Sequence, residues 1–128
     1  MKRSIVLTGI LKDGEDLLIV QRSKNDDKFP GAWEFPGGHL EDYETIKDGL
    51  KRELCEEIGF MNDFDPIITN YTDYIDDNNI HNIEIDFIIN VNKDDLNIKL
   101  SNEHIDYKWV KKDSNLLDDF IKNKLNNM

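Results

Sequence analysis

The chain has 128 residues, of which 38% are hydrophobic, and this supports one globular domain over residues 1–128 with a modest core. Its formal net charge of −11 argues against binding a nucleic-acid polymer, which requires Lys and Arg side chains to displace counterions from phosphates. No apolar stretch approaches the roughly 20 residues that span a bilayer, no segment is typical of a signal peptide, and the single cysteine excludes an intramolecular disulfide. We therefore expect a cytoplasmic protein that does not bind membranes.

The N-terminal part of the chain has the pattern of paired strands. Residues 4–12 form an apolar, β-branched run, and an Asp-Gly turn signal at 13–14 separates it from a second run at 17–22. This pattern predicts a β-hairpin. Trp33-Glu34-Phe35 predicts a short third strand, which ends at the strong breaker Pro36-Gly37-Gly38.

A helix follows this breaker. Thr45 is a favoured N-cap residue, Gly59 supplies a C-terminal stop, and apolar residues recur between them at every fourth position. These apolar residues are Ile46, Leu50, Leu54 and Ile58. Gly49 lies in mid-helix, where glycine costs roughly 1 kcal/mol relative to alanine, so we expect another part of the backbone to approach it closely.

The C-terminal half continues with three strands and a closing helix. Residues 66–75 precede a turn-rich Asp-Asp-Asn-Asn stretch, residues 83–91 alternate in polarity, and residues 105–110 form another short strand pattern. The closing helix has an apolar face and takes Asp113 or Ser114 as its cap. This apolar face consists of Leu116, Leu117, Phe120, Ile121 and Leu125. The whole order predicts an α/β fold in which helices flank a mixed β-sheet.

Three carboxylates are crowded on the central helix. The chain contains 18 Asp and 9 Glu, yet between residues 38 and 60 Glu outnumbers Asp by five to two. Glu53, Glu56 and Glu57 fall within an arc of about 100° on the helix. Such crowding raises pKa values or requires a cation, and oxygen-only ligands suit Mg²⁺ or Mn²⁺. A solvated acidic face is the alternative interpretation.

Neighbouring residues favour the metal site over the solvated face. Arg52 is spaced i,i+4 from Glu56 and orients a carboxylate while keeping its own charge. Gly37 and Gly38 precede the helix by a short acidic loop, where bare backbone carbonyls and amides are available to a metal ion or a phosphate.

The same stretch resembles the Nudix box throughout. Gly38 is followed after five residues by Glu44 and after seven more by RELCEEIGF, residues 52–60, with every fixed position filled. WEFPGG, residues 33–38, leads into the box as in nucleoside triphosphate members of that family. EHIDYKWV, residues 103–110, is similar to the family segment that carries a further metal-binding glutamate. The chain is identified as a MutT-type member of the Nudix hydrolase family.

This resemblance implies an α/β/α sandwich that hydrolyses a nucleoside diphosphate linked to another group. The residues that match metal ligands are Gly37 through its carbonyl, Glu53, Glu56, Glu57 and Glu103. Glu53 is the leading candidate for the base that deprotonates the attacking water, with Glu103 as an alternative. Arg52 and Glu44 match a supporting ion pair. The cofactor implied is Mg²⁺, with Mn²⁺ as a possible substitute.

Four residues are candidates for binding the substrate. Arg22 matches a position where relatives contact phosphates or base, although a solvated strand end explains it equally well. Phe35 is expected in the pocket wall, and Gly38 offers bare backbone to a phosphate. Glu34 either reads the edge of a ligand or is merely exposed on its strand.

Several other polar residues carry no such expectation. His39, His81 and His104 lack the spacing of metal ligands, so we expect them on the surface. Glu84 and Asp86 lie on the polar side of a strand, from which they could approach the metal ions, but we expect them to be solvated.

The resemblance implies that a (deoxy)nucleoside triphosphate is converted to the monophosphate and pyrophosphate. Alternatives are hydrolysis of ADP-ribose, a nucleotide sugar or a dinucleoside polyphosphate, or a nucleotide-sensing module without catalysis. Relatives that clean oxidised guanine nucleotides carry an arginine on a middle strand, and here no arginine follows Arg52. Preference for oxidised guanine is therefore not expected, and the chain is either a monomer or a homodimer that binds a small nucleotide.

Overall fold

Residues 1–126 are the part of the chain that the computed structural model describes, and they form strands, two α-helices and one 3₁₀ turn. The expected domain end at residue 128 lies outside the described residues. In chain order the elements are β1 (Lys2–Asp13), β2 (Asp16–Arg22), β3 (Trp33–Glu34), β4 (Gly37–His39), α1 (Ile46–Ile58), β5 (Ile67–Ile75), β6 (Ile80–Asn90), η1 (Lys93–Asp95), β7 (His104–Val110) and α2 (Asp119–Asn123).

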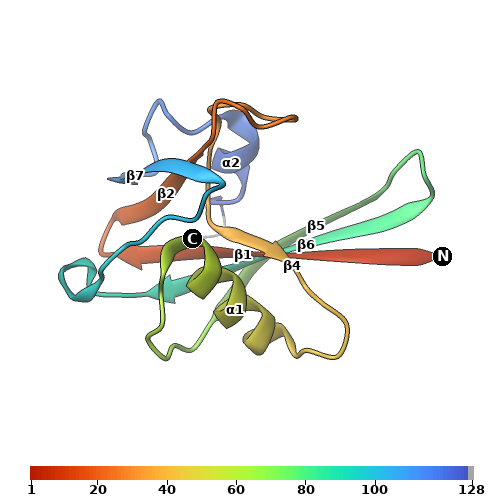
Figure 1. The fold of residues 1–128 in the computed structure, drawn as a ribbon, viewed down its shortest axis with the longest axis horizontal. Coiled ribbons are helices and arrows are strands. Elements are labelled where there is room, and N and C mark those ends of the chain that lie inside the picture. Colours follow the sequence, from red (N-terminus) through yellow and green to blue (C-terminus); the bar gives the residue numbers. More distant parts are fainter. Residues whose placement is uncertain (127–128) are drawn as a thin grey trace.

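The strands form the predicted mixed sheet, with β1 at its centre (Figure 1). Strand β1 pairs in parallel with β6 and antiparallel with β4, while β6 pairs antiparallel with β5. The predicted hairpin of β1 and β2 is present, but its paired residues lie only beside the turn, where Lys12 is opposite Leu17. Beyond the turn, β2 leaves β1 and pairs antiparallel with β3 and β7.

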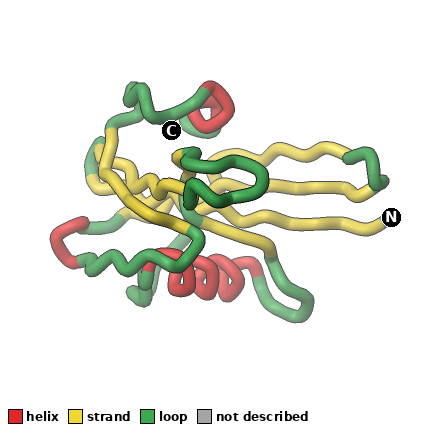
Figure 2. The backbone as a smooth tube through the Cα atoms, turned by 45° about the horizontal axis from the view of Figure 1, so that its top comes forward, coloured by secondary structure: helices red, strands yellow, loops and turns green. Residues whose placement is uncertain are grey.

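Two apolar cores lie on opposite faces of this sheet, because neighbouring residues of a strand point to opposite sides. Helix α1 covers one core and α2 the other. Figure 2 shows the two helices on opposite sides of the strands. The α1-side core contains Leu7, Leu11, Leu18, Val20, Leu50, Leu54, Ile58, Phe60, Phe87 and Ile89. The α2-side core contains Ile10, Leu17, Ile19, Phe35, Leu117, Ile121 and Leu125. This arrangement is the expected α/β/α sandwich.

Helix α1 begins and ends where the sequence predicts. The Thr45 hydroxyl accepts a hydrogen bond from the Asp48 amide at 3.2 Å, which satisfies one free donor of the first turn. Gly59 adopts φ 70° and ψ 20°, the left-handed conformation that glycine takes readily, and its amide donates to the Cys55 carbonyl. Of the predicted apolar stripe, Leu50, Leu54 and Ile58 pack on the sheet, whereas Ile46 at the start of the helix is 39% exposed.

The Pro-Gly-Gly stretch is not a simple breaker, contrary to the prediction. Gly37, Gly38 and His39 form β4 and lie opposite Thr8, Leu7 and Val6 of β1. A Cβ on Gly37 would strike the Leu7 carbonyl oxygen. Close approach of the two backbones therefore explains why glycine occupies a strand here.

The closing helix is shorter than predicted and begins later. Asp118 is its N-cap, with Oδ1 accepting from the Ile121 amide at 2.8 Å, so the expected cap at Asp113 or Ser114 was wrong. Phe120 is 58% exposed instead of joining the apolar face. Within residues 1–126, neither helix has the length and apolar character needed to cross a bilayer.

Candidate active site

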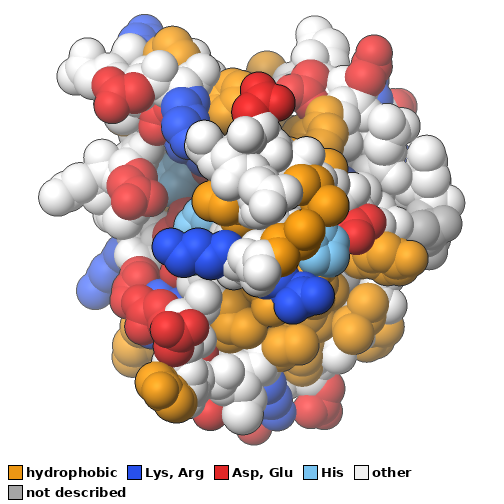
Figure 3. Space-filling model, turned by 90° about the vertical axis from the view of Figure 1, so that its right-hand side faces the viewer, with side chains coloured by type: hydrophobic (Ala, Val, Ile, Leu, Met, Phe, Trp, Pro, Cys, Tyr) orange, Lys and Arg blue, Asp and Glu red, His pale blue; other side chains and the backbone are white. Residues whose placement is uncertain are grey.

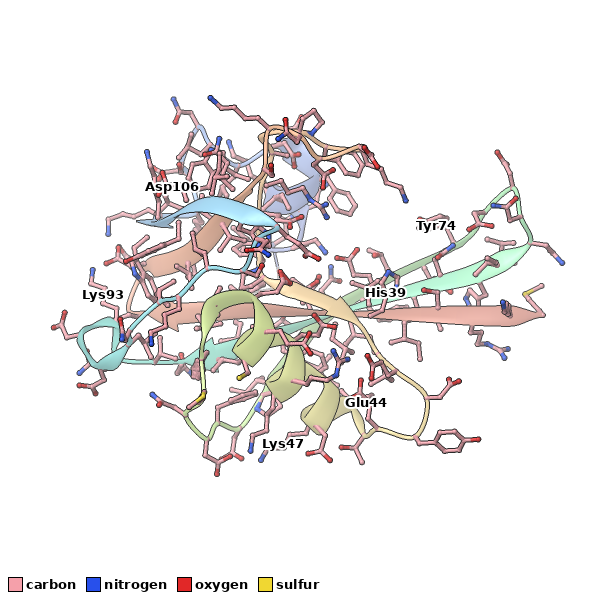
Figure 4. All side chains as sticks on the ribbon, in the orientation of Figure 1. His39, Glu44, Lys47, Tyr74, Lys93 and Asp106 are labelled. Carbon is pink, nitrogen blue, oxygen red and sulfur yellow. The ribbon has the colours of Figure 1, made fainter. Side chains whose placement is uncertain are left out.

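A cleft of about 690 Å³ opens where α1, β4 and the loop before β7 face β6 and α2. In Figure 4 the ribbons of α1 and β4 lie beside one another, with His39 on β4 and Glu44 next to the start of α1. The view of Figure 3 shows acidic, basic and histidine side chains close together on one face of the molecule. The lining residues used below are Thr8, Arg22, Glu34, Phe35, Gly37, Gly38, Glu53, Glu56, Glu57, Glu84, Glu103, Phe120 and Lys124.

Arg52 connects the carboxylates of the Nudix-like stretch. Its guanidinium donates to both oxygens of Glu44, at 2.7 and 3.0 Å, so the expected ion pair is present. Nη1 donates to Glu53 Oε1 at 2.8 Å and reaches Glu56 Oε2 at 3.4 Å, and Nη2 donates to the His39 carbonyl at 3.0 Å. One planar cation thus fixes the positions of three carboxylates and the end of β4.

These contacts determine how Glu44 titrates. Hydrogen bonds from Arg52, together with the Glu41 amide, lower the pKa of the Glu44 carboxyl to about 2. The same pairing raises the pKa of the Arg52 guanidinium. Both groups are therefore charged throughout the neutral range, and the ion pair is a permanent support of the helix.

Two glycines leave the space that the Glu53 and Glu44 carboxylates occupy. A Cβ on Gly38 would strike the carboxylate of Glu53. A Cβ on Gly49 would lie 2.6 Å from Leu40 Cδ1 and 2.9 Å from Glu44 Oε1. Side chains, and not another backbone segment, lie closest to Gly49, so the expected approach of backbone was wrong. The position still requires a small residue, because a Cβ would strike these side chains.

Glu57 is the most buried carboxylate of the cluster, with 6% of the residue exposed. Its Oε1 accepts a hydrogen bond from the Gly37 amide at 2.9 Å, which ties the last turn of α1 to β4. Burial raises the pKa of the Glu57 carboxyl to about 7, with Glu34 and Glu53 adding repulsion and the Gly37 amide and His104 opposing it. The site therefore holds negative charge that burial disfavours.

His104 is part of this cluster, contrary to the expected surface position. Its side chain is only 2% exposed, with Nε2 3.0 Å from Glu34 Oε2 and Nδ1 3.6 Å from Glu57 Oε2. An irregularity in the pairing of β2 with β7 sets Arg22 opposite His104. Sequence reasoning missed His104 because neither spacing nor periodicity links it to Glu34 or Glu57. Its position directly after Glu103 was the only available signal.

Arg22 and Glu34 also line the cleft, and each has a partner. Arg22 Nε donates to Glu34 Oε1 at 2.8 Å, and Nη1 donates to Asp26 Oδ2 at 2.9 Å. Glu34 thus lies between a guanidinium and the His104 ring. Neither residue is simply solvated at a strand end, and both present partly exposed polar groups to the cleft.

Phe35 and Glu103 complete the set of sequence candidates. Phe35 is 5% exposed, packs in the α2-side core and contributes to the cleft wall. Glu103 is exposed on the loop before β7, and its backbone carbonyl accepts from the Ser23 amide at 3.0 Å. All candidate residues except Arg52 and Glu44, which support the cluster from behind, line the same cleft.

The donor set fits a hard divalent cation. It consists of carboxylates and backbone carbonyls, the oxygen ligands that Mg²⁺ prefers, and the space above Gly38 already holds the Glu53 carboxylate. In the described part of the chain, no three His, Cys, Asp or Glu side chains already converge as a metal site does. Arg52 holds Glu53 and Glu56, and Gly37 holds Glu57, so side-chain rotation is needed to gather these ligands.

The opposite end of the cleft contains a second polar cluster. Lys124 Nζ donates to Glu84 Oε1 at 2.6 Å and to Asp86 Oδ1 at 2.9 Å, and the Thr8 hydroxyl donates to Glu84 Oε1 at 3.0 Å. Asp86 is fully buried and Lys124 is 3% exposed. The expectation of solvation was therefore wrong for Asp86, which is buried against Lys124 at the end of α2, whereas Glu84 stays partly exposed in the cleft.

Comparison with known proteins agrees with this geometry. The NUDIX domain family model matches residues 1–126. Nucleoside triphosphatase NudI of Salmonella paratyphi B is 33% identical over 121 residues, which cover 86% of this chain and 82% of that protein. The 8-oxo-dGTP diphosphatase of Proteus vulgaris is 40% identical over 58 residues, 45% of this chain and 52% of that protein. This chain therefore matches only about half the length of the Proteus enzyme.

Solved structures show the same architecture. The MutT protein from Methanosarcina mazei Go1 superposes with a TM-score of 0.78 at 26% identity, covering 96% of this chain and 90% of that one. A MutT NUDIX hydrolase from Burkholderia pseudomallei has a TM-score of 0.80 at 18% identity, covering 99% and 98%, and supports the fold alone. The chain therefore belongs to the NUDIX domain family and is a MutT-type Nudix hydrolase, a pyrophosphohydrolase enzyme.

Proposed function

We propose that this enzyme is a Mg²⁺-dependent, cytoplasmic pyrophosphohydrolase that converts a (deoxy)nucleoside triphosphate into the monophosphate and pyrophosphate. The observation that carries the proposal is that the Glu53, Glu56 and Glu57 carboxylates and the bare backbone of Gly37 and Gly38 lie in one cleft. The similarity to a protein named nucleoside triphosphatase supports the choice of substrate.

The candidate residues would have two roles, holding the cation and supporting the residues that hold it. Glu53, Glu56, Glu57, Glu103 and the Gly37 carbonyl would hold the cation. When bound, Mg²⁺ supplies neutralisation of the anionic phosphate chain and a lower pKa for the attacking water. Arg52 keeps Glu53 in one orientation through the 2.8 Å contact, and Glu44 fixes Arg52 in turn.

Glu53 would take the proton of the attacking water. The water oxygen then forms a bond to phosphorus, and the bond to the bridging oxygen breaks to release pyrophosphate and the nucleoside monophosphate. A rigid helix suits this role, because general bases act only within hydrogen-bond reach of the proton they abstract.

The test is a panel of nucleoside triphosphates, ADP-ribose, nucleotide sugars and dinucleoside polyphosphates, assayed with Mg²⁺, with Mn²⁺ and after chelation. We expect the highest kcat/KM for a nucleoside triphosphate, release of pyrophosphate, and loss of turnover without unfolding when the cation is removed. Activity that survives chelation contradicts the metal-dependent mechanism. Preference for a nucleotide sugar or ADP-ribose contradicts the substrate class, and tight binding without turnover of any compound indicates a sensor.

A further inference from the structure

The end of the cleft away from the α1 carboxylates has no part in the proposed reaction, yet it holds an ordered acceptor. Both Thr8 and Lys124 donate to Oε1 of Glu84, at 3.0 and 2.6 Å. Both of these hydrogen bonds therefore end on the same carboxylate oxygen. The Glu84 side chain is 26% exposed and lines the cleft, so Oε2 is available to a ligand.

The groups behind Glu84 hold it in place. Lys124 has a side chain only 4% exposed and also contacts the fully buried Asp86. A buried ammonium between two carboxylates fixes both of them, because moving either one leaves a charge without a partner. Glu84 is therefore an acceptor whose orientation is set before any ligand binds, which lowers the entropy cost of binding.

An aromatic side chain stands beside this acceptor. Phe120 lines the cleft with 58% of the residue exposed, and its ring centre lies 5.0 Å from Lys124 Nζ. An exposed aromatic ring at the edge of a cleft provides a stacking surface for a planar base. The Glu84 carboxylate and the Phe120 ring together suit a planar heterocycle that carries a hydrogen-bond donor.

The spacing of the strands agrees with a nucleotide that spans the cleft. Strand β1 lies between β6 and β4, with Val6 opposite Glu84 on one side and His39 on the other. Two strand spacings, roughly 10 Å, therefore separate the backbone of Glu84 from that of β4. Residues at both ends line the same cleft, so a ligand with its phosphates at β4 and α1 and its base near Glu84 stays within it.

We propose that Glu84 determines base specificity by accepting a hydrogen bond from the amino group of the nucleobase, while Phe120 stacks on the ring. The substrates are then nucleotides of amino-bearing bases, namely guanine, adenine and cytosine. Thymine, uracil and hypoxanthine lack this group, and uracil and thymine turn carbonyl oxygens towards the carboxylate. Lys124, Asp86 and Thr8 are positioning residues. The inference rests on the proposed function, since it concerns the base end of the same cleft.

The experiment compares substrates that differ by one amino group. For the wild-type enzyme with Mg²⁺, kcat/KM is measured for dGTP against dITP and for dCTP against dUTP. We expect the amino-bearing member of each pair to be preferred about tenfold or more, the effect of a hydrogen bond to a charged group. Affinities of the products dGMP and dIMP, measured by calorimetry, are expected to show the same preference.

The variant Glu84→Gln sharpens this test. Because Thr8 and Lys124 both donate, they hold the amide oxygen at the Oε1 position and turn the NH₂ group to the Oε2 position. An acceptor thereby becomes a donor, so we expect the dGTP/dITP and dCTP/dUTP ratios to fall at least about tenfold, towards or past unity. Glu15→Gln, in the exposed turn between β1 and β2, is the matched control and should retain both ratios.

The possible results distinguish failure of the base assignment from failure of the proposed function. Equal kcat/KM within both wild-type pairs overturns the base assignment and leaves the triphosphatase proposal intact. A folded Glu84→Gln enzyme with unchanged ratios also overturns it. Failure to hydrolyse any nucleoside triphosphate contradicts the proposed function and removes the inference with it.

Discussion

The two ends of the cleft differ in how the chain builds them. The carboxylate end takes most of its residues from one continuous stretch, 37–60, which contains β4, the acidic loop and α1. The other end joins Thr8 of β1, Glu84 of β6 and Lys124 after α2, whose side chains are separated by 76 and 40 positions along the chain. One end is a local motif, and the other exists only in the folded molecule.

This difference in construction corresponds to a difference in charge balance. At the carboxylate end, one partly exposed arginine serves Glu44, Glu53 and Glu56, and buried Glu57 has the His104 ring 3.6 Å away. At the other end, Lys124 contacts Glu84 and Asp86 directly. Arg52 is thus shared among three carboxylates and is partly exposed, whereas Lys124 is shared between two and is itself buried. A proposed metal site and a proposed fixed recognition surface have these contrasting needs.

The largest effect is expected at the carboxylate end. Glu53→Gln keeps the shape of the side chain but removes its ability to take a proton, so kcat should fall at least about 100-fold while the fold is retained. Steady-state kinetics and circular dichroism measure this, with Glu15→Gln as a matched surface control. Near wild-type turnover in a folded Glu53→Gln enzyme would remove Glu53 from the reaction.

At the Glu84 end of the cleft, removal of the Lys124 ammonium is expected to lower the stability of the fold. Lys124→Met leaves Asp86 buried without its charge partner, which should lower the free energy of unfolding by about 3–5 kcal/mol in urea titrations. Lys112→Met, at an exposed position, should cost little.

A second substitution separates unpaired charge from lost packing. Adding Asp86→Asn to Lys124→Met removes the stranded carboxylate and should recover part of the lost stability. If Lys124→Met costs less than about 1 kcal/mol, the view that Lys124 is the charge partner that stabilises buried Asp86 is wrong.

The smallest effect concerns the ion pair of Arg52 and Glu44. Because the pKa of Glu44 is lowered from its usual 4.5 to about 2, the pair contributes stability that is fully present above about pH 4.5. That contribution is lost as the pH falls from 4.5 towards 2, since in this range the unfolded state takes up a proton on Glu44 that the folded state does not. Urea unfolding across this range should show a shallower pH dependence for Glu44→Gln than for the wild type. Identical slopes would show that the pair does not contribute.

Local rules were sufficient where the contacts are local. The caps at Thr45 and Gly59 were predicted because capping needs only residues within one turn of the helix end. The hairpin at Asp13 was predicted for the same reason. Strand β4 was missed because glycine is disfavoured in strands by propensity, and the close approach of Gly37 to the Leu7 carbonyl overrides that preference.

Longer-range packing decided the remaining errors. His104 was expected on the surface, but the pairing of β7 with β2 buries it between Glu34 and Glu57. Phe120 fits the apolar face of a longer helix, and the cap at Asp118 shifts the helix so that this ring faces the cleft. Sequence patterns state which face of an element is apolar, but not what lies opposite it.

The sequence by itself determined the Nudix family, the boundaries of α1 and the arc of Glu53, Glu56 and Glu57, because the helical repeat places residues three and four apart on one face. Only the tertiary structure decided which polar groups meet across strands. Glu84 and Lys124 come together because the sheet and α2 fold over one another, and no spacing along the chain records that contact. The proposed reaction centre can therefore be read from the sequence, while the surface proposed to select the base is a product of the fold.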